Sequence, residues 1–389
     1  MVRYYIQNSV THKLTLIQVS FYIHKKQTWE GQKRRICMKK ILSHIFVDGI
    51  NGMALGIFCT YAFGIILQQL GSLITKDIGD FLITIGGLAI MLTGAGIAMG
   101  MASKFASPPL VALGGMLSGM VGAHADAIFE SSIVSKVGGM VKLSGAGNPL
   151  GAFIAAYVAL EVGQLILGKT QYDLLLIPLV GGGCGTITGL FLAPGFDVIN
   201  TRLADAFQWA TKQNNIVMGI VIACLSCMLS LLPISVLSIV SIAKLKGLAA
   251  GAATIGCCCS MIGYAVASYH DNKFVGLFAQ GIGTAKLQLA NTLKRPYILL
   301  PSLISSAILG GACGFLKFSN TAKGAAMGTT GLTGCLTAYD TIKNNIGASE
   351  ALLLVSLLCF VLPGVISLGI AEGMKKLGIL KEGEMKIEL

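Results

Sequence analysis

Long apolar runs are the feature that most constrains what this chain can fold into. About 20 apolar residues are enough for a helix to cross a bilayer. Only 12% of the 389 residues are charged, against about 25% in soluble proteins, so polar groups cannot cover a soluble surface. An outer-membrane barrel would instead show short segments of alternating polarity. The sequence therefore predicts an all-α polytopic integral membrane protein, with runs near 47–70, 80–103, 107–124, 149–168, 174–194, 215–243, 246–269, 297–316 and 350–371.

Basic residues predict the orientation of these helices. The net charge is +12, and the surplus lies mainly in the two terminal regions and in short loops. Positive loops remain on the cytoplasmic side and attract anionic lipid, so we expect both termini to be cytoplasmic, in a bacterial cytoplasmic membrane. An even number of crossings follows. We expect ten transmembrane helices, with nine as the alternative, and no nucleic-acid partner.

The chain divides into two predicted halves. Residues 1–37 are a basic extension, and Met38-Lys39-Lys40 is typical of a bacterial start, so we interpret Met38 as the biological start and the extension as not native. The first half then covers 38–194, an amphipathic linker 195–213, the second half 214–371 and a cytoplasmic tail 372–389. A second amphipathic interfacial helix is expected over 272–294. Pro-started, Gly-rich runs at 107–122 and 295–314 suggest an inverted repeat, which is a common transporter pattern.

Two Gly-rich segments, 125–148 and 317–345, are neither clean spans nor ordinary loops. Irregular backbone at membrane depth is tolerated only where it is buried in protein or lines a watery cavity. We therefore expect two re-entrant segments. Their polar residues are candidate solute contacts: His124, Asp126, Glu130 and Asn148 in the first, and Asn320, Thr329, Thr330 and Asp340 in the second.

Glu161 is the clearest charge within an apolar run, and Gln164 lies one turn further on the same helical face. Charges inside a bilayer are costly and tend to be functional. Glu161 is therefore predicted to bind solute or carry a proton, with a purely structural pair as the alternative.

A third candidate is the segment 280–295. Its polar residues recur at helical spacing and would form either the lining of a pore or the wet face of an interfacial helix. They are Gln280, Thr284, Gln288 and Asn291.

Motifs for catalysis are lacking. The sequence contains no Walker Gly-Lys-Ser motif and no paired Cys-x-x-Cys motif, so we expect no cofactor, metal or catalytic residue. Cys224-x-x-Cys227 and the run Cys257–Cys259 are interpreted as packing residues. A self-contained enzyme is therefore not expected.

Several motifs together resemble a known family. They are Asp48-Gly-Ile-Asn-Gly-Met-Ala-Leu-Gly56, Gly147-Asn-Pro-Leu-Gly151, Gly281-Ile-Gly-Thr284 with Gln288, Asn291 and Lys294-Arg-Pro296, and Gly328-Thr-Thr-Gly331. Over 38–375 the chain resembles the membrane (EIIC) subunits of the bacterial phosphotransferase system, in the subgroup of the perfringolysin regulator PfoR.

The resemblance implies a permease for a small polar solute, such as a sugar or related metabolite, and a homodimer. In better-known members, IIA and IIB proteins phosphorylate the solute with phosphate from phosphoenolpyruvate. Such partners would here be separate chains. The resemblance also leaves an alternative, a solute-binding membrane sensor or regulator of the PfoR type.

Overall fold

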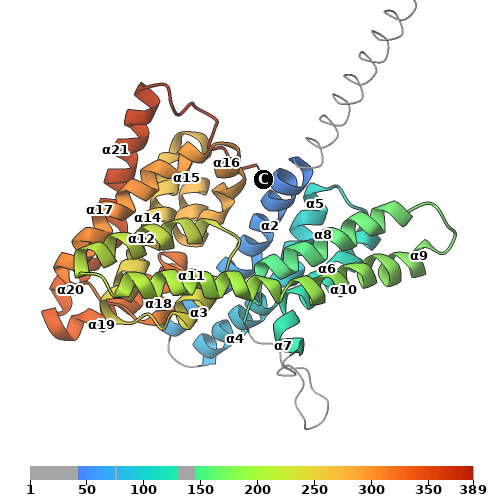
Figure 1. The fold of residues 1–389 in the computed structure, drawn as a ribbon, viewed down its shortest axis with the longest axis horizontal. Helices are drawn as coiled ribbons and strands as arrows, with labels where there is room; N and C mark the ends of the chain where they lie inside the picture. Colours follow the sequence, from blue (N-terminus) through green and yellow to red (C-terminus); the bar gives the residue numbers. More distant parts are fainter. Residues whose placement is uncertain (1–42, 75–76, 130–144, 389) are drawn as a thin grey trace, which may run out of the picture. The chain divides into compact units, whose positions relative to one another are not determined.

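The computed structural model describes residues 43–74, 77–129 and 145–388. The chain forms two units, Met1–Val47 and Asp48–Leu389, and the account below concerns the second. Its described residues are helical, apart from turns and one isolated bridge between Gly247 and Asn320 (Figure 1). The predicted extension 1–37, the start at Met38 and the candidate Glu130 lie outside the described residues.

The apolar runs of the sequence are helices. Within the described residues, six helices are long and apolar enough to cross a membrane. A seventh crossing arises if α4 (Asp77–Met91) and α5 (Thr93–Lys104), which meet at 57°, form one span. Two shorter apolar helices, α6 (Pro109–Ala123) and α12 (Asn215–Leu231), match the remaining runs. A multi-pass helical membrane protein is confirmed. The six are His44–Leu73, Pro149–Ile166, Asp173–Leu192, Gly247–Ala267, Pro296–Leu316 and Ala348–Lys376.

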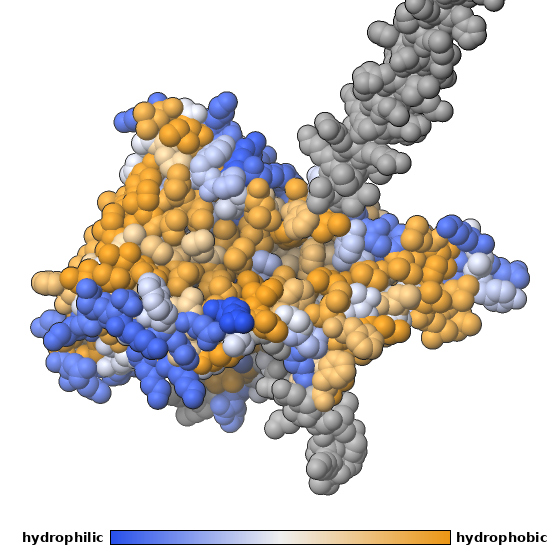
Figure 2. Space-filling view, in the orientation of Figure 1, coloured by the Kyte–Doolittle hydropathy of each residue, from blue (hydrophilic) through white to orange (hydrophobic). Residues whose placement is uncertain are grey.

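The surface agrees with this assignment. Figure 2 shows apolar residues over most of the visible helices. Hydrophilic residues gather near α16 (Leu289–Lys294) and the chain's end, and again near α19 (Thr333–Ile346). Large apolar side chains such as Phe191 (75% exposed) and Phe315 (76% exposed) face outward, where lipid solvates them.

The first half packs its helices through small residues. A Cβ placed on Gly56 would lie 2.2 Å from the carbonyl oxygen of Gly96, so two backbones touch there. Such close approach lets helices associate where lipid provides no hydrophobic drive. In this half, α2 (Ile50–Ile57) packs on α5 (Thr93–Lys104), and α3 (Phe63–Leu73) packs on α4 (Asp77–Met91). Helix α6 is followed by the short α7 (Ala125–Phe129). Helix α8 (Pro149–Ile166) packs on both α6 and α10 (Gly183–Leu192), and α10 comes after the short α9 (Asp173–Leu176).

The second half is built around α14 (Gly247–Ala267), which is the most buried of the six long helices. Helices α12, α17 (Leu300–Leu316) and α21 (Leu362–Lys376) pack on α14, and α20 (Ala348–Ser356) precedes α21. The predicted linker is the helix α11 (Gly195–Thr211). Its buried face includes Phe207, whereas Trp209 is exposed, and it packs on α12 and on α13 (Val236–Ile242).

Two helical hairpins enter the second half from opposite ends of α14. Hairpin A, residues 269–294, starts directly after α14 and consists of α15 (Tyr269–Phe278), η4 (Ala279–Gly283), η5 (Ala285–Gln288) and α16 (Leu289–Lys294). Hairpin B, residues 321–346, follows Asn320, which pairs with Gly247 at the other end of α14. It consists of α18 (Ala322–Met327), η7 (Thr330–Leu332) and α19 (Thr333–Ile346).

The tips of the two hairpins contact each other and the middle of α14. Because 21 helical residues rise about 31 Å, the roots of the hairpins are separated by nearly a bilayer thickness, while the tips meet between them. The expectation of one amphipathic helix over 272–294 is wrong. The segment folds back on itself, and the residues from Gly283 to Thr292 are buried, except for the partly buried Lys286.

Candidate functional site

A cavity lies where the first half meets both hairpin tips. Its volume is about 80 Å³. Segments far apart in the sequence build its wall. The lining residues are Ile57, Tyr61, Thr93, Ala146, Gly147, Pro149, Ser230, Ile234, Ser235, Val236, Leu237, Cys257, Met261, Gly283, Thr284, Ala285, Lys286, Ala326, Met327 and Thr330.

The tip of hairpin A brings a cation to the cavity. Lys286 donates from Nζ to the carbonyl oxygens of Leu232 and of Ile234, the latter at 3.4 Å. Leu232 is the C-cap of α12, where carbonyl groups lack helical partners and a positive charge is favourable. Thr284 accepts a hydrogen bond from the backbone N–H of Lys286 at 3.3 Å. The local fold thus orients Lys286 toward the end of α12, at the cavity wall.

Glycine is required at the tip of hairpin A. A Cβ on Gly283 would lie 2.5 Å from the ring of Phe58 on η2 (Phe58–Ala62). A larger residue would push the tip away from the first half and open the cavity.

The tip of hairpin B turns at Gly328, whose φ of +51° strains other residues. A Cβ there would lie 2.7 Å from Cβ of Cys257. The two threonines that follow donate to the Sδ of Met261, Thr329 at 3.4 Å and Thr330 at 3.5 Å. The tip is therefore anchored to the middle of α14, and only Thr330 of this threonine pair lines the cavity.

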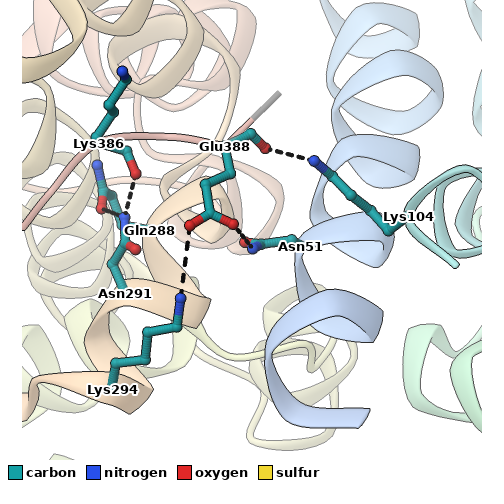
Figure 3. A network of polar contacts seen from close by, with 7 residues as sticks. All are labelled: Asn51, Lys104, Gln288, Asn291, Lys294, Lys386 and Glu388. Atoms are coloured by element: carbon teal, nitrogen blue, oxygen red, sulfur yellow. Dashed lines mark hydrogen bonds and ion pairs between the residues drawn. The ribbon is translucent and has the colours of Figure 1, made fainter. Parts of the chain in front are cut away.

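Gln288 and Asn291 bind the end of the chain (Figure 3). Gln288 donates to the carbonyl of Met385 at 2.7 Å, and Asn291 donates to that of Lys386 at 2.9 Å and to the Gln288 side chain at 2.9 Å. We call residues 381–388 the strap. Of the polar stripe that predicted a pore lining or a wet face, Gln288 and Asn291 bind the strap, whereas Thr284 lines the cavity.

The strap is held from several sides. On α15, Asp271 accepts from the backbone N–H groups of Gly383 (2.9 Å) and Met385 (3.0 Å), and Asn272 exchanges two bonds of 2.8 Å with the strap.

The strap also reaches the first half (Figure 3). Glu388 accepts from Asn51 of α2 at 3.4 Å and pairs with Lys294 at 3.7 Å, while its carbonyl accepts from Lys104 of α5 at 3.1 Å. The strap therefore ties hairpin A to two helices of the first half.

The candidates on α8 lie apart from the cavity lining. Glu161 is partly buried within the first half, and Gln164 donates to the Ser107 hydroxyl at 2.8 Å. Asn148 is the N-cap of α8 and accepts from the backbone of Leu150 at 3.1 Å. It neighbours the lining residues Gly147 and Pro149.

The candidates after α6 lie at its far end. His124 follows α6 and is 5% exposed, and within the described residues its Nε2 has no hydrogen-bond partner. Asp126 belongs to α7 and is partly buried. Neither is among the lining residues.

Three further candidates have structural partners. Gln280 is fully buried in hairpin A and donates to Ser268 at 2.9 Å. Asn320 donates to the Thr254 hydroxyl and to a backbone carbonyl, both at 2.8 Å, which secures the root of hairpin B. Asp340 is exposed and pairs with Lys343 at 2.6 Å, and this carboxylate raises the pKa of Lys343.

Thr284 and Thr330 are therefore the predicted candidates that the structure brings together in the cavity wall. Two further lining residues, Lys286 and Tyr61, were not predicted from the sequence. Lys286 had a signal, because it is the one charged residue between Phe274 and Leu293. Tyr61 had none, since an aromatic residue in an apolar run usually belongs to the core.

Three buried cysteines also converge. The sulfur atoms of Cys258 on α14, Cys335 on α19 and Cys359 on η8 (Leu357–Val361) lie within 4.8 Å of one another. All three belong to the main apolar cluster of the second half, where small, polarizable side chains fill space well.

Most of this architecture matches a known protein family. The family model described as "Phosphotransferase system, EIIC" matches residues 47–387, which include both halves, both hairpins and nearly all of the strap. The chain belongs to the EIIC family of the phosphotransferase system. It is thus a multi-pass membrane component of a phosphotransferase-system transporter. The family resemblance is confirmed, and the PfoR subgroup stays a prediction. No curated protein matches the chain.

Proposed function

We propose that this EIIC protein carries a small polar solute across the bacterial cytoplasmic membrane and binds it in the cavity between its two halves. The observation that carries the proposal is the cavity itself, because the first half and two hairpins from opposite ends of α14 meet there. Transporters typically bind substrate near the midplane, where broken helices from two halves converge. Relative movement of the halves would then open the cavity to either side.

Both hairpins are proposed to be re-entrant. Hairpin B lies in the predicted re-entrant segment 317–345, whereas most of the other predicted segment, 125–148, lies outside the described residues. Each tip is irregular, glycine-containing backbone that is buried in protein and lines the cavity, which is the setting in which such backbone is tolerated in a membrane. Helices α6 and α17 are the proposed counterparts of an inverted repeat, since each precedes a Gly-rich segment that contributes to the same wall.

The termini are proposed to share the cytoplasmic side, which requires an even number of crossings. The predicted ten would need one crossing besides the nine apolar runs and the two re-entrant hairpins. The hydrogen bond between Asn51, near the start of the first long helix, and Glu388 in the strap supports an even number. Lys104, Lys294 and Arg295 lie around the strap, and a concentration of basic residues favours the cytoplasmic side.

Separate IIA and IIB proteins are the proposed phosphoryl donors, and a homodimer is the proposed assembly. Both follow from the family rather than from a contact of this chain.

Filling the cavity tests the transport proposal. Ala326 lines the cavity and is partly buried in α18, so Ala326→Phe should abolish uptake of labelled three- to six-carbon polyols and sugar acids into proteoliposomes. Val365→Phe, at a position 63% exposed on α21, is the matched control and should leave uptake unchanged. Equal uptake by the Ala326→Phe variant and the wild type would refute the cavity as the transport site.

A second proposal concerns Glu161. A carboxylate within an apolar span is costly, and Glu161 is positioned in α8 outside the cavity lining. We propose that Glu161 binds the solute or carries a proton during transport. Reduced uptake by Glu161→Gln is expected, and unchanged binding and uptake would remove this role.

A sensor of the PfoR type is the alternative function. The strap favours it, because one segment near the chain's end contacts both halves and could report their movement to a partner. Solute that binds the purified protein but never crosses a liposome membrane would support the sensor over the permease.

A further inference from the structure

We infer that the solute bound in this cavity carries an anionic group, a carboxylate or a phosphate, which Lys286 recognises. The inference rests on the proposed function and adds the chemical class of the substrate. Among the lining residues, Lys286 is the only one with a charged side chain.

The cation retains a free donor. An ammonium group has three N–H bonds, and Lys286 uses two of them on the carbonyls of Leu232 and Ile234. Carbonyl groups compensate part of the charge, whereas no carboxylate lines the described wall. Even a partly buried cation is favoured by an opposite charge nearby, so an anionic solute would complete the site.

Hydroxyl groups add further donors to the wall. Tyr61 donates to the Sδ of Met327 at 3.5 Å, and Thr330 donates to the Sδ of Met261 at the same distance. Thioether sulfur is a weak acceptor, so both hydroxyls can turn to a stronger acceptor at little cost. Thr284 uses its oxygen as an acceptor, which leaves its O–H free to donate.

The cavity is therefore rich in donors and has one positive charge. Helix α8 also begins at this wall, and the positive end of its dipole adds to the same field. A hydroxyl group of a neutral polyol can also accept from these donors, but a polyol brings no negative charge to offset that of Lys286. Carboxylate and phosphate oxygens only accept, and charge-assisted bonds to them are the stronger kind.

The test uses three ligands that share a three-carbon skeleton: glycerol, glycerate and glycerol 3-phosphate. The purified full chain, in nanodiscs of neutral phosphatidylcholine, is titrated with each by calorimetry at constant ionic strength. At least one anion should bind about tenfold more tightly than glycerol, since hydrogen bonds to charged groups are the stronger ones. The stronger of the two anions distinguishes carboxylate from phosphate.

Variants locate the interaction. Lys286→Met should weaken binding of that anion by about tenfold or more, and Lys286→Arg should retain most of it. Lys343→Met removes an exposed lysine outside the cavity and should change nothing. Because Lys286 also caps α12, Tyr61→Phe is a milder second variant, expected to weaken anion binding roughly two- to tenfold.

Three results would overturn the inference. They are binding of glycerol as tight as that of both anions, anion affinity unchanged in Lys286→Met, and failure of both anions to bind at millimolar concentration. The proposed function fails separately, when Ala326→Phe leaves uptake intact. If Ala326→Phe abolishes uptake and Lys286→Met does not, the result supports transport through the cavity and refutes the inference that the solute is an anion.

Discussion

Glycine faces glycine where α12 and α17 cross, and a single methyl group there should destabilise the second half. A Cβ on Gly310 would lie 2.4 Å from the carbonyl oxygen of Gly219 and 2.6 Å from Cβ of Ala223. Ordinary contacts at such atoms are 3.4 Å or more. Gly310→Ala therefore requires the two helices to separate by about 1 Å, and α14, which packs on both, must adjust as well.

The cost follows from this geometry. Overpacking a well-packed interior costs about 1–3 kcal/mol, and the rigid backbone neighbour places Gly310→Ala at the upper end. Replacing helical glycine by alanine returns about 1 kcal/mol through helix propensity. We expect a net loss of about 1–2 kcal/mol, which lowers a melting temperature by several degrees at roughly 2–4 °C per kcal/mol.

Buried cysteines provide the assay. Cys227, Cys257 and Cys313 are at most 1% exposed, so a thiol-reactive fluorescent dye reaches them only on unfolding. The control is Gly369→Ala on α21, where a Cβ meets nothing within 4 Å. This variant should raise the melting temperature slightly, because alanine has the higher helix propensity. Equal or higher stability of Gly310→Ala, at the same scan rate as the control, would refute the close-packing argument.

A double variant tests whether the two helices must separate. Gly219→Ala places a Cβ 2.1 Å from the Gly310 carbonyl oxygen, so either substitution forces the same helix separation. The double variant should lose less stability than the sum of the two single variants, because residues in contact couple. Simple additivity would show that each methyl group is accommodated locally, without helix movement.

Three smaller predictions test the strap and hairpin B. Asp271→Ala removes the acceptor of two strap amides, and limited proteolysis should then cut the strap faster; an unchanged rate would contradict its anchoring role. Asn320→Ala removes two hydrogen bonds, to the Thr254 hydroxyl and to the Gly334 carbonyl, although each of these groups keeps a second partner. At about 0.5–1.5 kcal/mol per hydrogen bond, the loss in the dye assay should be about 1–3 kcal/mol, whereas no loss would mean that the root of hairpin B is held by other contacts. Asp340→Asn should leave the melting temperature unchanged between pH 6 and 8, because the ion pair with Lys343 is exposed and such pairs contribute little. The carboxylate raises the pKa of Lys343, so whatever stability the pair contributes is present at neutral pH and is lost only at high pH. A clear change in the melting temperature of this variant between pH 6 and 8 would contradict the prediction.

The amino-acid sequence alone determined the membrane class, the positions of the apolar helices and the family. These depend on local quantities, namely the length of an apolar run and short motifs, which hold wherever the helices finally pack. The linker α11 was predictable for the same reason, because an amphipathic face is written at helical spacing. Gly328 and Gly283 could be recognised as special positions, although the contacts that require glycine there could not.

Tertiary structure decided which polar residues meet. Gln288 and Asn291 have the helical spacing of a pore lining, yet they bind the strap, a segment nearly 100 residues away in sequence. Thr284 and Thr330 come together because two hairpins enter from opposite ends of α14. A hydrogen-bond donor looks the same in the sequence whether it faces backbone, lipid or a cavity, and only the packing of distant segments distinguishes these cases.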